Sequence, residues 1–116
     1  MDPKVQYPYL KEIRIWKCNA RDEGARMVCE FLKINSVHKT PVLTCDMMGN
    51  CITSLGCEFF GQMLSPAHNT TLKVLKLDHN PIGWQGLAQL ARGISQNATL
   101  NVKIFDCILR FLVTES

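Results

Sequence analysis

One eleven-residue segment constrains this chain more than any other feature of its sequence. From Leu72 to Ile82 it reads LKVLKLDHNPI, with apolar residues at positions 1, 4, 6 and 11 of the segment and asparagine at position 9. The alternation around positions 4 and 6 is typical of a strand that buries one face. An asparagine just after such a strand indicates a turn whose backbone groups need a partner.

The same spacing occurs twice upstream. Units that begin at Leu10 and Val42 have apolar residues at positions 1, 4 and 6, and glycine at position 15 in common with the unit at Leu72. A fourth strand near Leu100 fits after deletion of one residue. Units that begin near residues 10, 42, 72 and 100 predict a stack of equivalent supersecondary repeats.

The second half of each unit has the spacing of an amphipathic helix. Apolar residues recur at three- and four-residue steps in 21–32, 55–64 and 83–94, which indicates one helix per unit. Thr53 or Ser54 can cap the second helix, and Pro66 is expected to end it. Each unit therefore predicts a strand followed by a helix.

In this register the chain resembles the ribonuclease-inhibitor-like subfamily of leucine-rich repeats. The resemblance rests on the helix-bearing units, on Asn-x-Thr-Leu before the later strands, and on Cys or Asn at position 9, and it covers residues 10–109. It implies an α/β fold, a short leucine-rich-repeat solenoid of about 3.5 repeats, with parallel strands on the concave face and helices on the convex face. Residues 1–9 are then an N-terminal extension or cap, and 110–116 a C-terminal tail or cap.

Two sets of side chains are expected to stabilise these units. Inward strand residues should form the core: Ile13, Ile15, Cys45, Met47, Leu75, Leu77, Val102 and Ile104. Position 9 should form a structural ladder: Cys18, Asn50, Asn80 and Cys107. We expect the two asparagine amides to bind loop backbone groups, and we expect the cysteines, including those at this position, to be reduced thiols that pack as small buried residues.

Outward strand positions form the predicted partner-binding surface on the concave face. These residues are Arg14, Trp16, Asp46, Met48, Lys76, Asp78, Lys103 and Phe105. Exposed aromatic residues and methionine beside arginine are typical of protein interfaces. The alternative is that Trp16 and Phe105 only cover neighbouring side chains. The basic residues that lean to this face would favour an acidic partner.

Other classes of function have little support. The chain has 116 residues, 47% of them hydrophobic, and a net charge of +3, which fits one ordinary globular domain. His38, His68 and His79 lack metal-ligand spacing, and no set of converging catalytic groups is apparent, so we expect no enzyme, no metal and no cofactor. No apolar run is long enough to cross a membrane and no signal peptide is apparent, so a cytoplasmic location is expected.

The sequence therefore predicts a non-catalytic scaffold that binds a protein partner through the concave face and the exposed ends. It would act as a small subunit of a larger complex, such as a cytoskeletal or ciliary assembly. One alternative is an RNA-binding module that uses the basic and aromatic residues of that face. The other is a fragment or isoform of a larger inhibitor or of an innate-immune receptor repeat domain.

Overall fold

The computed structural model describes residues 10–37, 41–65 and 71–96. Three strands alternate with three helices along this part of the chain. In chain order they are β1 (Glu12–Arg14), α1 (Arg21–Asn35), β2 (Thr44–Asp46), α2 (Ser54–Met63), β3 (Val74–Lys76) and α3 (Gly83–Gln96). We call the three strand–helix pairs unit 1, unit 2 and unit 3.

The three strands form one parallel sheet in the order β1-β2-β3. Ile13 pairs with Cys45, and Cys45 pairs with Leu75. Backbone hydrogen bonds continue this register beyond the strands. Ile15 N donates to Asp46 O at 2.9 Å, and at the equivalent place in the next unit Met47 N donates to Lys76 O at 3.0 Å. Leu10, Val42 and Leu72 therefore lie at equivalent places, each two residues before its strand. The predicted fourth unit at Leu100 lies outside the described residues.

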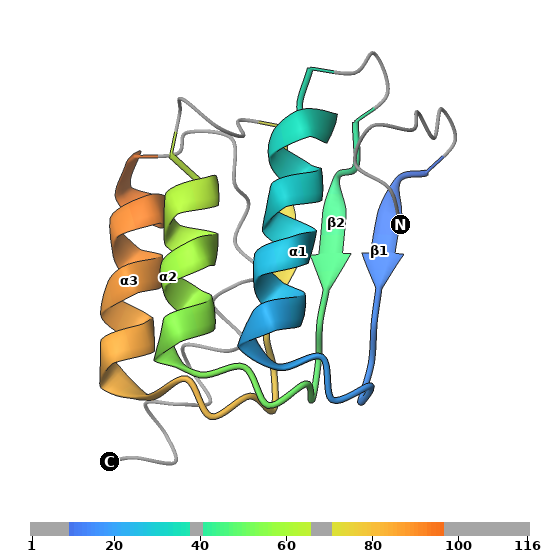
Figure 1. Ribbon diagram of the computed structural model, residues 1–116. Helices are drawn as coiled ribbons and strands as arrows, with labels where there is room; N and C mark the ends of the chain where they lie inside the picture. Colours follow the sequence, from blue (N-terminus) through green and yellow to red (C-terminus); the bar gives the residue numbers. More distant parts are fainter. Residues whose placement is uncertain (1–9, 38–40, 66–70, 97–116) are drawn as a thin grey trace.

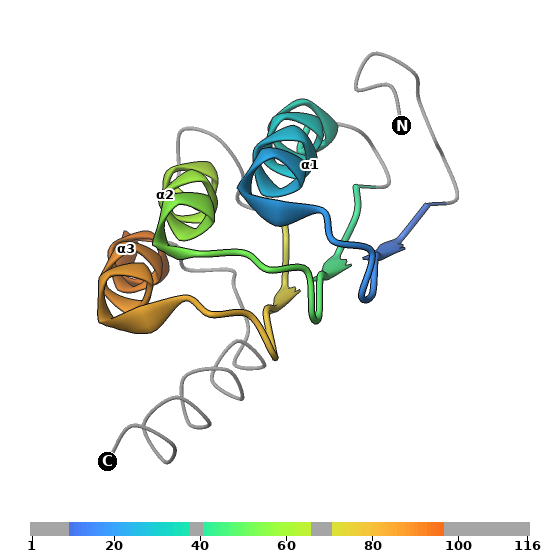
Figure 2. The same ribbon diagram turned by 60° about the horizontal axis from the view of Figure 1, so that its bottom comes forward.

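The helices pack side by side over one face of the sheet, so that the described residues form two layers (Figures 1 and 2). The core lies between the layers. Five of the predicted inward residues are buried, namely Ile13, Cys45, Met47, Leu75 and Leu77, and Ile15 is half-buried against them. The mixed strand and helix arrangement is compatible with a short leucine-rich-repeat fold.

Glycines allow the helices to approach one another closely. A Cβ atom built on Gly61 in α2 would lie 2.4 Å from the Gln89 carbonyl oxygen of α3, and one on Gly93 would lie 2.7 Å from the Gly61 oxygen. Both distances are shorter than a Cβ contact allows, so the absence of a side chain at these positions sets the separation of α2 and α3.

Of the five described cysteines, three are buried as expected and two are exposed. Cys29, Cys45 and Cys57 are buried, and every described cysteine is a reduced thiol. Cys18 and Cys51 are exposed instead of packed, so the prediction that they are buried is wrong. Both lie in turns that follow strands, at the surface of the stack. Cys107 lies outside the described residues.

Candidate functional site

Asn50 ties unit 2 to the turn of unit 1. Its side chain is fully buried, and its Oδ1 atom accepts hydrogen bonds from Cys18 N at 3.1 Å and Ala20 N at 3.3 Å. Its Nδ2 atom donates to Ile15 O at 2.6 Å and Met48 O at 3.1 Å. One amide thus satisfies backbone groups that a turn beside the core would otherwise leave unpaired.

Asn80 performs the same task one unit later. Its Oδ1 atom accepts from Asn50 N at 2.8 Å and Ile52 N at 3.0 Å, and its Nδ2 atom donates to Met47 O at 3.0 Å. Both asparagines thus bind backbone groups in the turn of the preceding unit. Cys18, at the same position of unit 1, instead directs its thiol to the Trp16 carbonyl oxygen of its own turn at 3.0 Å.

The sequence did not predict the role of Asp22, which joins two helices. Its carboxylate accepts hydrogen bonds from Thr53 N at 2.8 Å, Thr53 Oγ1 at 2.6 Å and Gly56 N at 3.0 Å. Thr53 Oγ1 in turn accepts from Leu55 N, as expected for the cap of α2. Asp22 lies in the first turn of α1, and its carboxylate binds the start of α2.

The side of the sheet away from the helices carries the predicted partner-binding residues. We call it the outer sheet face, and among the described residues it consists of Glu12, Arg14, Trp16, Thr44, Asp46, Met48, Val74, Lys76 and Asp78. Strand alternation explains this placement, because Ile13, Cys45 and Leu75 point into the core from the same strands.

Three side chains form an ordered group at the β1 edge of this face. The Arg14 guanidinium carbon lies 4.7 Å from the centroid of the Trp16 ring, within the range of a cation–π contact. Nη2 of Arg14 donates to Oε1 of Glu12 at 2.9 Å. The group remains open to solvent, since Trp16 is 44% exposed and the side chains of Arg14 and Glu12 are also exposed. Glu12 therefore holds Arg14 against the ring without covering it.

The other predicted residues of this face differ in exposure. Met48, Lys76 and Asp78 are half-buried. Asp46 is only 5% exposed and its Oδ1 atom accepts a hydrogen bond from Met48 N at 3.3 Å. A carboxylate covered in this way supports its own turn more than it offers a contact. Lys103 and Phe105 lie outside the described residues.

Positive charge predominates around the outer sheet face. Lys11, Lys17 and Lys73 are exposed at or next to the strands. The acid that could offset them locally, Glu12, is already engaged by Arg14, and Asp46 is buried. Asp78 is half-buried, so the fully exposed charge here is mainly basic, which favours an acidic ligand.

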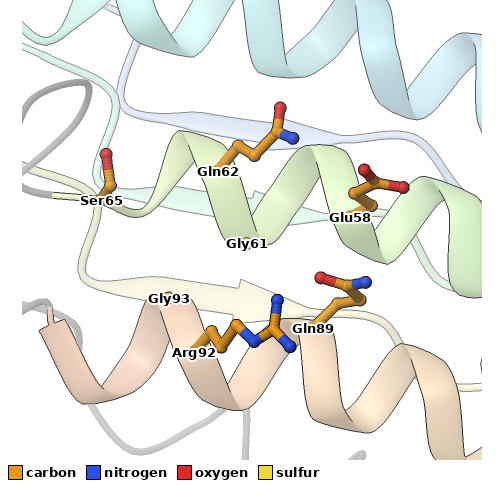
Figure 3. Close-up of a pocket in the computed structure, with 7 residues that line it drawn as sticks. All are labelled: Glu58, Gly61, Gln62, Ser65, Gln89, Arg92 and Gly93. Atoms are coloured by element: carbon orange, nitrogen blue, oxygen red, sulfur yellow. The ribbon is translucent and has the colours of Figure 1, made fainter.

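Two further surface features lie on the helix side. Leu55 and Trp84, in the first turns of α2 and α3, are 53% and 58% exposed, and the sequence spacing had assigned both only to helices. A groove of about 340 Å³ also lies between α2 and α3 (Figure 3). Its lining is polar or glycine: Glu58, Gly61, Gln62, Ser65, Gln89, Arg92 and Gly93.

The described residues provide no constellation for metal binding. No three His, Cys, Asp or Glu side chains in the described segments are grouped so that they could hold a metal ion. Burial raises the pKa of the Cys45 thiol to about 12, and the neighbouring Asp46 charge adds to this effect. Burial also raises the pKa of Cys29. Both thiols therefore stay protonated, which is the opposite of what a thiolate nucleophile or metal ligand needs.

None of α1, α2 and α3 is both long enough and apolar enough to cross a bilayer.

Two comparisons with known proteins agree with this geometry. The family model described as Leucine Rich repeat matches residues 68–91. The ribonuclease inhibitor of Mus musculus is 29% identical over 105 residues, an alignment that covers 84% of this chain and 21% of the inhibitor. The chain thus spans about a fifth of the length of this curated relative. The resemblance to leucine-rich repeat proteins of the ribonuclease-inhibitor-like type is confirmed, and such proteins are typically non-catalytic scaffolds that bind other proteins.

Proposed function

We propose that this chain is a non-catalytic module that binds a partner protein on the outer sheet face, with Arg14 and Trp16 as the central contacts. The observation that carries the proposal is the exposed Arg14–Trp16 stack. Tryptophan and arginine are the residues most enriched among energetically dominant interface contacts. Glu12 and the cation–π contact hold the pair in one arrangement, so less side-chain entropy is lost when a partner binds.

We further propose that the partner presents an acidic surface. The exposed charges around the face are Lys11, Lys17 and Lys73, besides the ion pair of Arg14 with Glu12. Complementary charge speeds association and disfavours basic competitors more than it adds affinity. Binding is therefore expected to weaken as the salt concentration rises, mainly through a slower association rate.

The direct test is affinity capture with matched variants of the full chain. Trp16→Ala and Arg14→Ala should each reduce retention of the same partner protein by at least about tenfold, as is typical of a dominant interface residue. Trp84→Ala removes the more exposed tryptophan of the helix side and should leave retention unchanged. Circular dichroism should show that all three variants fold. Equal retention by Trp16→Ala and the wild type would refute the assignment of the face.

RNA is the competing ligand for a basic and aromatic surface. Phosphate binding gives a steep dependence on salt, with a slope that rises by roughly 0.7 for each single-strand phosphate contact. Titration of the chain with a single-stranded RNA at several salt concentrations distinguishes the two ligands. Tight binding with such a slope, lost in Trp16→Ala, would replace the protein partner by RNA.

Inhibition of a ribonuclease is the activity that the name of the relative suggests. The chain spans only a fifth of that protein, so we treat a ribonuclease as one candidate partner and not as the assigned one. A ribonuclease assay with and without the chain tests it. Inhibition that Trp16→Ala abolishes would identify the partner, and inhibition that this variant retains would place the contact elsewhere.

We propose, as a narrower form of this function, that the chain is a small cytoplasmic subunit of a larger cytoskeletal or ciliary assembly. Exposed apolar side chains on and after α1 support a second contact surface, since Met27 is 57% exposed and Val37 is 84% exposed. Sedimentation of a native extract on a density gradient tests this. The chain should travel in fractions far heavier than its own mass of 13.1 kDa, and sedimentation as a monomer would contradict it.

A further inference from the structure

One edge of the sheet is formed by β1. Within the described residues, no strand pairs with β1 on the side away from β2 (Figure 1). Ile15 N donates to Asp46 O at 2.9 Å, so the backbone groups of Ile15 point towards β2. Backbone groups of successive strand residues point to opposite edges, so those of Glu12 and Arg14 point away from β2. The edge therefore carries backbone donors and acceptors that no described strand binds.

Unit 2 shows what such backbone groups bind when a strand lies beside them. Glu12 and Arg14 are paired in register with Thr44 and Asp46 of β2. Thr44 N donates to Lys11 O at 3.2 Å, and Asp46 O accepts the hydrogen bond described above. The counterparts of these groups on β1 thus have the geometry to bind one more strand.

An apolar groove opens beside this edge, between the end of β1 and α1. Its volume is about 320 Å³, near the lower end of the range of roughly 300 to 1,000 Å³ for pockets that hold a ligand. Its apolar lining includes Ile15, Met27, Phe31 and Met47. Phe31 and Met47 are at most 1% exposed, whereas Met27 at the rim is 57% exposed. In a strand beside β1, the side chains that face the helix layer would therefore lie at this groove.

The flank of α1 at the groove has no helix against it among the described residues. A Cβ atom built on Gly56 of α2 would meet Asp22 Oδ1 of α1 at 2.6 Å. Gly24 has the same place in α1, and the described atom that its Cβ would meet is Ala20 Cβ of its own unit, at 2.5 Å. In the described part of the chain, unit 1 thus has an open flank where unit 2 has a neighbour.

The charges along the edge favour an acidic occupant from another protein. Lys11 and Lys17, which lie before and after β1, are exposed, and Arg14 lies between them. Glu12 is the acid of this edge, and it is already bonded to Arg14. A second copy of the chain, joined edge to edge, would bring the same basic residues together, and like charges across an interface are unfavourable. The edge therefore suits a strand with acidic residues from a different protein.

We propose that an extended segment of the partner protein adds to the sheet as a strand beside β1. Apolar side chains of this segment lie in the groove, and they alternate with acidic side chains that lie on the outer sheet face. Strand addition of this kind draws affinity from main-chain hydrogen bonds and specificity from alternate side chains. The inference rests on the proposed function, because the same partner contacts Arg14 and Trp16.

Selection of random peptides displayed on phage, against the immobilised full chain, provides a probe. Selected peptides should have apolar and acidic residues at alternate positions. In a synthetic copy of one such peptide, N-methylation of every second amide should weaken binding at least about tenfold, because those amides face β1, and methylation of the amides between them should not. Failure to select any peptide, or equal tolerance of methylation at all positions, would overturn the proposal.

Amide hydrogen exchange locates the bound peptide. With peptide, the Glu12 and Arg14 amides should exchange at least about tenfold more slowly, and the Ile15 amide, which already donates to Asp46 O, should not change. Slow exchange at Glu12 and Arg14 in the absence of peptide would also overturn the proposal, since a second copy or another part of the chain would then occupy the edge.

A matched pair of variants tests the groove. Met27→Ser removes an apolar side chain from its rim and should weaken peptide binding at least about fivefold. Leu55→Ser removes a leucine of α2 that is 53% exposed and should leave binding unchanged. Equal affinities of the two variants would contradict the assignment of the groove. If peptide binding fails these tests while Trp16→Ala still reduces capture of the partner, strand addition alone is rejected and the proposed function stands.

Discussion

Asp22 illustrates how a single residue links two units of this chain. Three donors from the start of α2 converge on its carboxylate, and nothing in its local sequence distinguishes it from its neighbour Glu23. The difference is positional. Asp22 faces α2, whereas Glu23 faces solvent and pairs with Arg26 on its own helix.

These two neighbours form a matched mutational pair. Asp22→Ala should lower the free energy of unfolding by roughly 1 to 3 kcal/mol, because it leaves the half-buried Thr53 and Gly56 amides without their acceptor. Glu23→Ala should change it by no more than about 0.5 kcal/mol, since an exposed ion pair contributes little. Urea denaturation measures both values. Equal losses for the two variants would mean that the Asp22 hydrogen bonds are not stabilising.

The cysteines provide a second residue-scale prediction. At pH 8 an alkylating reagent should modify the exposed Cys18 and Cys51 of the folded chain rapidly, and the buried Cys29, Cys45 and Cys57 only after denaturation. Peptide mapping by mass spectrometry reports each site. Fast modification of Cys45 in the absence of denaturant would show that unit 2 opens.

The pKa of Cys45 also fixes the direction of a pH effect. Burial raises this pKa from 9.0 to about 12, so between these values the folded state keeps a proton that the unfolded state loses. The contribution of the thiol to stability is therefore full below pH 9 and is lost as the pH rises towards 12.

At the scale of elements, much of the arrangement could be predicted from the sequence. Apolar residues at fixed positions in three units predict the strands and their parallel register. They also predict which strand residues point inward, because only one face of each strand can be buried beside its helix. The helix ends were less predictable. α1 extends to Asn35. Oδ1 of this buried asparagine accepts a hydrogen bond from Val42 N at 2.6 Å. Such a tertiary contact leaves no signal in the local sequence.

The repeat pattern did not predict how exposed some residues are, because exposure depends on the neighbouring units. At position 9, Asn50 is buried and Asn80 half-buried, each bonded to the turn of the preceding unit, while Cys18 is exposed. Asp46 differs from its equivalents Arg14 and Lys76 because it lies on the central strand and bonds its own turn. A position in a repeat predicts the direction of a side chain, whereas its exposure depends on neighbours in other units.

The close contact of α2 and α3 gives a prediction at this scale. Gly61→Ala should destabilise the chain by roughly 1 to 3 kcal/mol, because the added methyl group meets a backbone carbonyl that can move only if α3 moves. Gln62→Ala, at the next residue of the same helix and on its exposed side, should be nearly neutral. Thermal unfolding compares them. A stabilised Gly61→Ala variant would show that the helices are not in close contact.

At the scale of the whole molecule, we propose different roles for the two sides of the sheet. The helix side holds the core and the ties between units, so its substitutions should act on stability. The outer sheet face has an exposed Arg14–Trp16 stack and unpaired basic residues that contribute little to the core. Separation of stability from binding is what a protein-binding scaffold requires.

The central claim is that a partner protein contacts the outer sheet face. It is tested most directly by photo-crosslinking in a native extract, with a photoreactive phenylalanine derivative in place of Trp16 in one chain and of Trp84 in another. We predict one protein adduct of defined mass from position 16, reduced by excess unmodified chain, and none from position 84. Adducts from position 84 with none from position 16 would contradict the account and move the binding surface to the helix side.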